Sequence, residues 1–187
     1  MNAIGLVIGT LLIASPGGPK DDAQAGFEKF EAMVGEWEGA NQNGLKIRHK
    51  YTLIGNGSVV MEESWFDAHK GDMMVTMYSL HEGKLILTHY CVAKNQPRLV
   101  ASKIQDKGAK LEFTFMDATG IPNREVGHMD RATYEFISPD RYKTRWTWYQ
   151  KGKEQWMEEF DLKRIKAGSA FEASAVAPKC CLATGKG

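Results

Sequence analysis

Between Gly35 and Arg164 the sequence alternates apolar and polar residues in short runs, and residues typical of turns separate the runs. Ten strands are expected, at residues 36–41, 45–54, 58–66, 72–80, 84–92, 97–105, 109–117, 128–137, 140–150 and 154–164. The short dividers, such as Asn43-Gly44, indicate antiparallel hairpins. An open sheet would leave two edges unpaired, and closure removes them. We therefore predict an all-β fold, a ten-stranded antiparallel up-and-down barrel.

A short amphipathic helix is expected before the first strand. Its apolar positions, at helical spacing, are Phe27, Phe30, Met33 and Val34. Gly35 ends this pattern, and the helix should close one end of the barrel. The alternation is lost after residue 166, so we predict a barrel domain over residues 26–166 and a disordered tail over residues 167–187.

The N-terminal residues have the pattern of a secretory signal peptide. An apolar run from Ala3 to Ala14 is shorter than the roughly 20 residues that span a bilayer. A helix-breaking segment follows, and then Ala23-Gln-Ala25, an A-x-A cleavage pattern. Residues 1–25 are therefore predicted to be a signal peptide or a disordered leader, and the protein to be exported to the periplasm or the extracellular space.

Charge and cysteine content exclude some classes of protein. The formal net charge of +1 argues against a nucleic-acid-binding protein, which would need a basic excess. The three cysteines are Cys91, Cys180 and Cys181, and an odd number leaves one thiol unpaired. Neighbouring cysteines would form a strained bridge, so either Cys91 pairs with the tail or it is a buried free thiol, which we prefer.

The parity of each strand predicts which side chains face the barrel interior. The inward aromatic residues are expected to be Tyr51, Phe113, Phe115, Tyr134, Trp146, Trp148 and Trp156. Glu158 shares a face with Trp156 and should point into the same interior. Both faces of residues 84–92 are apolar, so parity leaves open which of them lines the lumen. Whether these side chains enclose a cavity or fill the lumen is also open.

The stretch from Leu85 to Arg98 places many chemically capable side chains beside apolar surface, and it is the predicted wall of a binding site. The residues expected to contact a ligand are His89, Cys91, Asn95, Gln96, Arg98, His128, Tyr134, Trp146, Trp148 and Glu63. Arg98 could hold a carboxylate. Glu62 and Glu63 are adjacent, so one must face inward, and we assign Glu63 to the interior. His89 could instead be a wall residue with satisfied hydrogen bonds.

The segment Val34-Gly-Glu-Trp37 resembles the G-x-W signature of the calycin barrels, which include lipocalins, fatty-acid-binding proteins and nitrobindin. The match to exported, uncharacterised lipocalin-like domains would cover about residues 26–165. The resemblance implies that Trp37 plugs one barrel end. It also implies that Arg164, on the closing strand, packs across this tryptophan.

The preferred function is a non-catalytic barrel that carries a small apolar or amphipathic ligand in its lumen. One alternative is an enzyme that uses His89, Tyr90 and Glu63 as acid and base groups. Another is a haem protein like nitrobindin, although no histidine follows His128, where the resemblance would place the axial ligand. No cofactor and no metal are predicted, since paired C-x-x-C or H-x-H spacing is absent from the sequence. A transmembrane span is not expected either, and the oligomeric state stays open.

Overall fold

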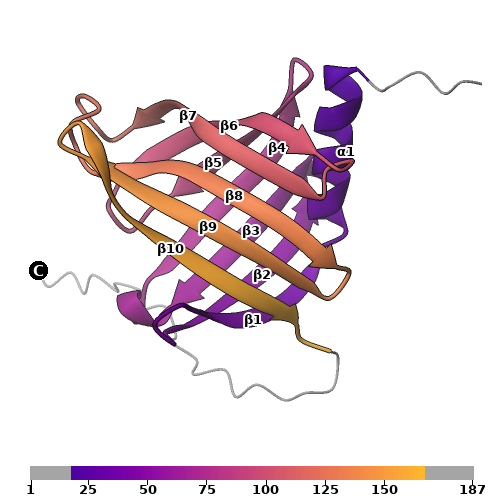
Figure 1. Cartoon of the computed structure of the whole chain (residues 1–187), viewed down its shortest axis with the longest axis horizontal. Coiled ribbons are helices and arrows are strands. Elements are labelled where there is room, and N and C mark those ends of the chain that lie inside the picture. Colours follow the sequence, from indigo (N-terminus) through magenta and orange to yellow (C-terminus); the bar gives the residue numbers. More distant parts are fainter. Residues whose placement is uncertain (1–17, 167–187) are drawn as a thin grey trace, which may run out of the picture.

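The computed structural model describes residues 18–166, which form a closed ten-stranded barrel preceded by one α-helix (Figure 1). The elements are α1 (Pro19–Glu31), β1 (Gly35–Asn41), β2 (Lys46–Ile54), η1 (Gly55–Gly57), β3 (Val59–Phe66), η2 (Asp67–His69), β4 (Met73–His81), β5 (Lys84–Tyr90), β6 (Gln96–Gln105), β7 (Lys110–Thr119), β8 (His128–Ser138), β9 (Arg141–Gln150) and β10 (Lys153–Arg164). Each strand pairs antiparallel with the next, and β1 pairs with β10 to close the barrel. The predicted fold class is confirmed.

The helix begins earlier than the apolar spacing indicated. Pro19 occupies the first turn, where its missing N–H costs nothing, and the Asp21 carboxylate accepts a hydrogen bond of 2.9 Å from the Gly18 N–H. The A-x-A pattern that ends at Ala25 therefore lies inside α1. The predicted tail, and residues 1–17 of the predicted leader, lie outside the described residues.

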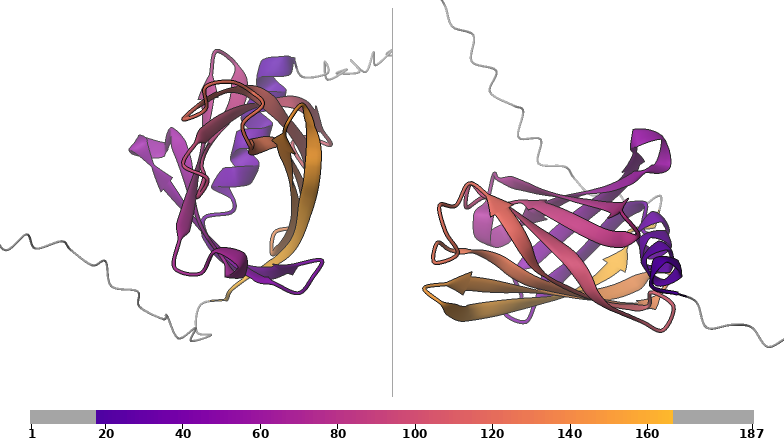
Figure 2. Two further views of the ribbon diagram at one scale, coloured as in Figure 1. Left: turned by 90° about the vertical axis from the view of Figure 1, so that its left-hand side faces the viewer. Right: turned by 90° about the horizontal axis from the view of Figure 1, so that it is seen from above.

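Helix α1 covers one end of the barrel, where it lies against β4, β5 and β6 (Figure 2). Its buried face comprises Ala23, Phe27 and Phe30, which recur at helical spacing. Gly26 allows this close approach, because a Cβ there would lie 3.0 Å from the Leu85 side chain. The helix thus acts as the predicted lid of this end.

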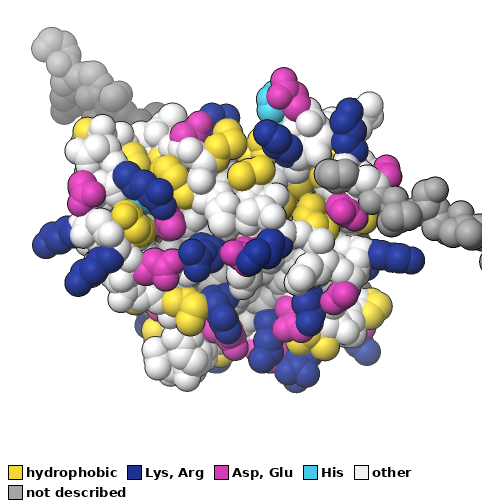
Figure 3. Space-filling view, turned by 45° about the horizontal axis from the view of Figure 1, so that its top comes forward, with side chains coloured by type: hydrophobic (Ala, Val, Ile, Leu, Met, Phe, Trp, Pro, Cys, Tyr) yellow, Lys and Arg dark blue, Asp and Glu magenta, His cyan; other side chains and the backbone are white. Residues whose placement is uncertain are grey.

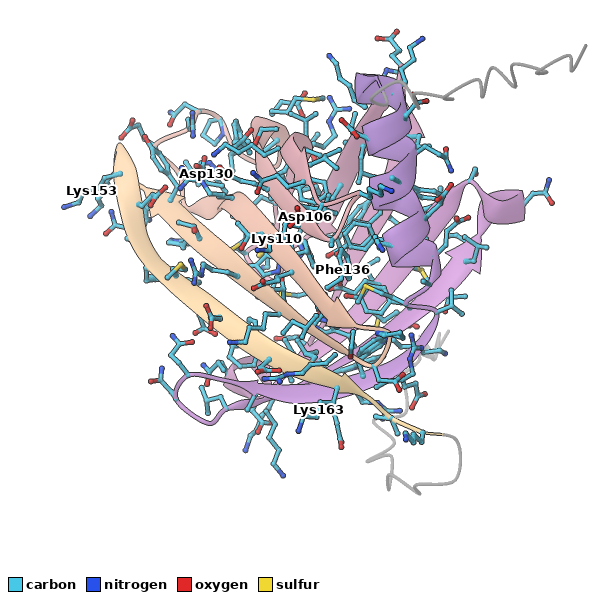
Figure 4. All side chains as sticks on the ribbon, turned by 45° about the vertical axis from the view of Figure 1, so that its right-hand side comes forward. Asp106, Lys110, Asp130, Phe136, Lys153 and Lys163 are labelled. Carbon is cyan, nitrogen blue, oxygen red and sulfur yellow. The ribbon has the colours of Figure 1, made fainter. Side chains whose placement is uncertain are left out.

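Aromatic rings fill the half of the lumen next to α1. Phe30 is fully buried and stacks on Tyr78 with ring centroids 3.9 Å apart. The same ring meets Tyr134 and Phe136 edge-on, at 5.1 and 5.5 Å. Figure 4 shows Phe136 close to the helix, and Lys153 at the far tip of the β9–β10 hairpin. This half of the barrel is a packed core. Of the two possibilities left open by the sequence, an enclosed cavity or a filled lumen, the second holds here.

Trp37 and Arg164 lie opposite each other on β1 and β10, just after the helix ends. Arg164 packs across the indole of Trp37, as the calycin resemblance implied. The Trp37 Nε1–H donates to the Met33 carbonyl at 2.8 Å, and the Arg164 guanidinium lies 4.3 Å from the centre of the indole ring. Arg164 also donates to the carbonyls of Val34 at 2.8 Å and Ala32 at 2.7 Å. Trp37 and Arg164 thereby satisfy three consecutive carbonyls, Ala32, Met33 and Val34, in the turn that follows α1.

The outer surface carries charges of both signs in cross-strand pairs. Arg145 on β9 donates to Glu159 on β10 at 2.6 Å, and Lys103 on β6 donates to Glu112 on β7 at 3.0 Å. Lys and Arg side chains are intermixed with Asp and Glu on the face seen in Figure 3. The alternation in the sequence therefore places these ion pairs on the outer face and the large apolar side chains on the inner face.

Replacing Arg164 with lysine tests the role of this end of the barrel. Lysine keeps the charge but cannot serve several carbonyls and stack on Trp37 together, so we expect Arg164→Lys to lower the free energy of unfolding by about 1–2 kcal/mol. Arg98→Lys, in an exposed ion pair with Asp117, should change it by less than about 0.5 kcal/mol. Urea unfolding measures both values, and equal effects would contradict the assigned role.

Candidate ligand-binding site

A cavity of about 630 Å³ occupies the half of the lumen away from α1. Its lining residues are Ile47, His49, Glu62, Ser64, Phe66, Ala68, His69, Asp72, Met74, His89, Cys91, Val92, Ala93, Met129, Trp146, Trp148, Trp156, Glu158 and Phe160. Pockets for small molecules have volumes of roughly 300–1,000 Å³, so this one is of ordinary size for a ligand site. The predicted alternative of an open lumen applies to this half of the barrel.

Aromatic side chains form much of the cavity wall. Trp148 and Trp156 face each other across β9 and β10, with rings stacked at 5.6 Å and 3° between planes. Phe66 and Phe160 meet edge-on at 5.2 Å on another part of the wall. Gly127 makes room for Trp148, since a Cβ there would lie 2.3 Å from the indole. The wall therefore offers large, rigid apolar surfaces.

The cavity floor is polar, and its centre is the Glu62 carboxyl group. Glu62 is 2% exposed, and its Oε2 accepts hydrogen bonds from the hydroxyls of Tyr51 at 2.7 Å and Tyr78 at 2.6 Å. The network continues from Tyr51 to Tyr142 at 3.0 Å and from Tyr78 to Tyr134 at 2.7 Å. Four tyrosines from β2, β4, β8 and β9 thus support one acidic side chain.

Burial fixes the protonation of these tyrosines. It raises the pKa of Tyr51 and of Tyr78 well above the ordinary value, and the negative charge of Glu62 raises both further. The pKa values of Tyr134 and Tyr142 are raised in the same way. All four hydroxyls therefore remain protonated at physiological pH and serve as hydrogen-bond donors.

Two histidines complete the floor. The Tyr142 hydroxyl lies 2.6 Å from His49 Nδ1, and the Thr76 hydroxyl lies 3.0 Å from His89 Nδ1. His89 Nε2 is buried and has no hydrogen-bond partner among residues 18–166. Burial lowers the pKa of His89 to about 4, with Glu62 opposing this shift and His49 adding to it. Burial also lowers the pKa of His49, against the opposing charge of Glu62.

Several predicted site residues meet at this cavity. His89 and Trp146 are in contact, with ring centroids 4.9 Å apart, and Cys91 and Trp148 also line the wall. Tyr134 lies in the tyrosine network beneath the floor. The odd face of β5 therefore lines the lumen, which answers the question that parity left open. Cys91 is a free, half-buried thiol, while Cys180 and Cys181 lie outside the described residues.

Other predicted residues lie outside the lumen, and these predictions are corrected. Arg98 is on the outer face of β6 in an ion pair with Asp117, so it cannot hold a carboxylate inside. Glu63 faces outward beside Lys50, with 3.8 Å between the charged groups, because Glu62 takes the inward position.

The three residues of the enzyme hypothesis, His89, Tyr90 and Glu63, therefore do not lie together. Tyr90 is 48% exposed on the opposite face of β5 from His89, and Glu63 is also outside. Only His89 of these three residues reaches the cavity. The structure thus removes the arrangement on which the acid–base hypothesis depended.

Asn95 and Gln96 have structural positions at the turn after β5. The Asn95 side chain is 1% exposed and donates to the Gly127 carbonyl at 2.9 Å. Gln96 accepts a hydrogen bond of 2.5 Å from Thr119 at the surface. Asn95 thus links two loops, Gln96 links the ends of β6 and β7, and neither side chain lines the cavity.

His128 was predicted to face the lumen, and this prediction is corrected: Met129, its neighbour in the sequence, lines the cavity, and the β8 register shifts between Met129 and Arg131. His128 is fully buried but does not line the cavity. Its Nδ1 lies 2.6 Å from the Val126 carbonyl, and its Nε2 lies 3.5 Å from Asp130. Arg124 forms an ion pair with Asp130 and lies over the ring of Tyr149 at 4.7 Å. These contacts hold the loop between β7 and β8.

The sequence could have identified more of the floor. Tyr51 and His49 had the inward parity on β2, and the turn at η1 places Tyr51 opposite Glu62 in the strand pairing. Tyr78 and Tyr142 have the same parity as buried neighbours on their own strands. The sequence does not reveal the strand register, which brings these residues to the same depth in the barrel.

The described residues support neither a metal site nor a helical membrane span. Between residues 18 and 166, no group of three or more His, Cys, Asp or Glu side chains could hold a metal ion. In the same range, no helix is both long and apolar enough to cross a bilayer.

No protein-family model matches the chain, and no curated protein sequence matches it. Among solved structures, it is similar to a protein of unknown function from the DUF3598 family of Nostoc punctiforme. The identity is 12% and the TM-score 0.49, over 73% of this chain and 49% of that chain. It is also similar to the S-type phycobiliprotein lyase CPES from Guillardia theta, with 15% identity and a TM-score of 0.47, over 81% and 99% of the two chains. The chain spans about half the length of the first of these structures.

The buried histidines predict how stability depends on pH. In the unfolded chain a histidine gains a proton near pH 6.5, whereas folded His89 does so only near pH 4. Between these values the unfolded state binds more protons, so stability falls as the pH falls, by up to about 3 kcal/mol from His89.

His89→Gln should therefore reduce the loss of unfolding free energy between about pH 7 and about pH 4. His81→Gln removes an exposed imidazole and is the matched control. Urea unfolding at several pH values provides the measurement. Equal pH dependence in the wild type and in His89→Gln would show that His89 is not protected from protonation.

Proposed function

We propose that this protein binds a small amphipathic molecule in the open half of its barrel and releases it unchanged. The observation that supports this most is the cavity of about 630 Å³, with an aromatic wall and a buried polar floor. Specific small-molecule sites combine mostly apolar walls with a few fixed polar groups. The apolar part of the ligand would contact Trp146, Phe160 and Met74, and its polar part would reach Glu62 and His89.

The floor is suited to binding more than to catalysis. The four tyrosines keep their protons at neutral pH, and burial makes protonation of the two floor histidines unfavourable. A general acid or base works best with a pKa near the working pH, and the shifts found here move away from it. The hydrogen bonds around Glu62 hold it at a fixed position in the barrel.

Haem is a second candidate ligand because His89 Nε2 is a buried, unpartnered ligand atom within the described part of the chain. The lining fits haem poorly, however, since it contains Glu62, Asp72 and Glu158 and no Lys or Arg among the described residues to pair with two propionates. A Soret shift on adding haemin, lost in His89→Gln, would favour haem over the proposed ligand.

We also propose that the protein is exported, on the basis of the apolar run Ala3–Ala14. Cleavage after Ala25 would remove the first turns of α1 and the buried Ala23. We therefore expect the mature protein to begin at or before Pro19. Intact-mass measurement of the protein recovered from the periplasm or medium tests this, and a mature chain starting at Gly26 would contradict it.

Two neighbouring residues allow a matched test of binding in the lumen. Cys91 lines the cavity, whereas Tyr90 points to solvent on the other face of the same chain segment. Cys91→Trp places an indole in the cavity, so we expect it to weaken binding of the neutral dye Nile red by roughly tenfold or more. Tyr90→Trp should leave the affinity within about twofold.

Fluorescence titration of Nile red gives these affinities, and native mass spectrometry of the purified protein looks for a retained ligand. Circular dichroism and thermal unfolding check that both variants are folded. Absence of Nile red binding, or an equal effect of the two substitutions, would contradict a ligand site in the lumen.

A further inference from the structure

The charge of the cavity lining is one-sided. Glu62, Asp72 and Glu158 contribute three carboxyl groups, and the described lining contains no Lys or Arg. Elsewhere the barrel pairs its acids with bases, as in the contacts of Arg145 with Glu159 on the outer surface. The cavity is therefore acidic in a chain whose formal net charge is only +1.

Glu62 lacks a cationic partner within the described residues. Its Oε2 receives the two tyrosine hydroxyls, while its Oε1 lies 3.9 Å from His49 Nε2, too far for a hydrogen bond. Burial lowers the pKa of His49, so this imidazole is uncharged at physiological pH. A buried carboxylate is unfavourable unless it is paired with a charge or fully hydrogen-bonded.

The surroundings of Glu62 suit a cation with an apolar body. The indole of Trp146 and the rings of Phe66 and Phe160 line the same cavity, and aromatic faces attract cations. Glu158 is half-buried in the cavity wall, 3.3 Å from the Asn41 amide, and adds negative potential there. The unpartnered His89 Nε2 can accept a hydrogen bond when its proton is on Nδ1.

We propose that the ligand is an organic amine, with a protonated amino group that binds Glu62 Oε1 and an apolar body that lies against the aromatic wall. This inference rests on the proposed function and specifies the ligand class of the same cavity. An ammonium group has three N–H donors and would supply both the missing charge and the missing hydrogen bond. A fatty acid would bring a second negative charge to the same floor, so the inference excludes it as the preferred ligand.

Three molecules with the same chain and different head groups test the inference: decylamine, 1-decanol and decanoate. Each competes with Nile red for the wild-type protein at neutral pH, where decylamine is cationic. We expect decylamine to bind roughly tenfold more tightly than 1-decanol, and decanoate to bind most weakly. Equal affinities for the three molecules, or tightest binding of decanoate, would overturn the inference.

Glu62→Gln and Glu63→Gln form a matched pair, because the two side chains are adjacent and point to opposite faces. Glutamine can still accept the tyrosine hydrogen bonds, so Glu62→Gln should weaken decylamine binding about tenfold while changing 1-decanol binding less than about twofold. Glu63→Gln should change neither. A Glu62→Gln variant that keeps the preference for decylamine would also overturn the inference.

The outcomes separate the two proposals. If Nile red does not bind, the proposed function itself is wrong. If Nile red binds but the amine has no advantage, only the amine inference fails. If Glu62→Gln does not fold, Glu158→Gln takes its place, and we expect this variant to lose about threefold in decylamine affinity. The relative affinities of the wild-type protein for the amine, the alcohol and the carboxylate test the inference in either case.

Discussion

The buried carboxyl group of Glu62 is the constraint on which the interior of this barrel depends. An acidic side chain that is 2% exposed needs donors around it, and Tyr51 and Tyr78 provide them directly. Because these tyrosines come from strands on both sides of β3, the hydrogen bonds also fix the relative register of β2, β3 and β4. Polar contacts of this kind specify one arrangement more strictly than apolar packing does.

The tyrosine layer divides the lumen into two halves with different roles. On the side of α1, Phe30 packs among aromatic rings and leaves a solid core, which stabilises the closed barrel. On the other side, the inward residues of the same strands surround open space. The helix and the Arg164–Trp37 contact belong to the first half, so changes in the cavity wall can alter binding without removing the main source of stability.

The sequence predicted the barrel and much of the wall because both depend on local patterns. Alternation and turn residues located all ten strands, and parity placed Trp146, Trp148 and Tyr134 inside. The errors have physical causes that no local pattern reveals. Adjacent Glu62 and Glu63 look alike in sequence, and only pairing of β2 with β3 sets which one faces inward. Arg98 lies at an irregularity in the β6–β7 register and faces solvent, where Asp117 pairs with it.

Affinity and selectivity would come from different parts of this cavity. Removing a cation from water costs free energy that offsets most of the attraction in a buried ion pair, so Glu62 would add only about tenfold to the affinity for an amine. Most of the affinity would come from apolar area buried against Trp146, Phe66 and Phe160. Glu62 would also penalise anionic ligands, since two like charges at the floor repel each other where no Lys or Arg of the described lining compensates. Charge at the floor would thus select the ligand, and apolar area at the wall would hold it.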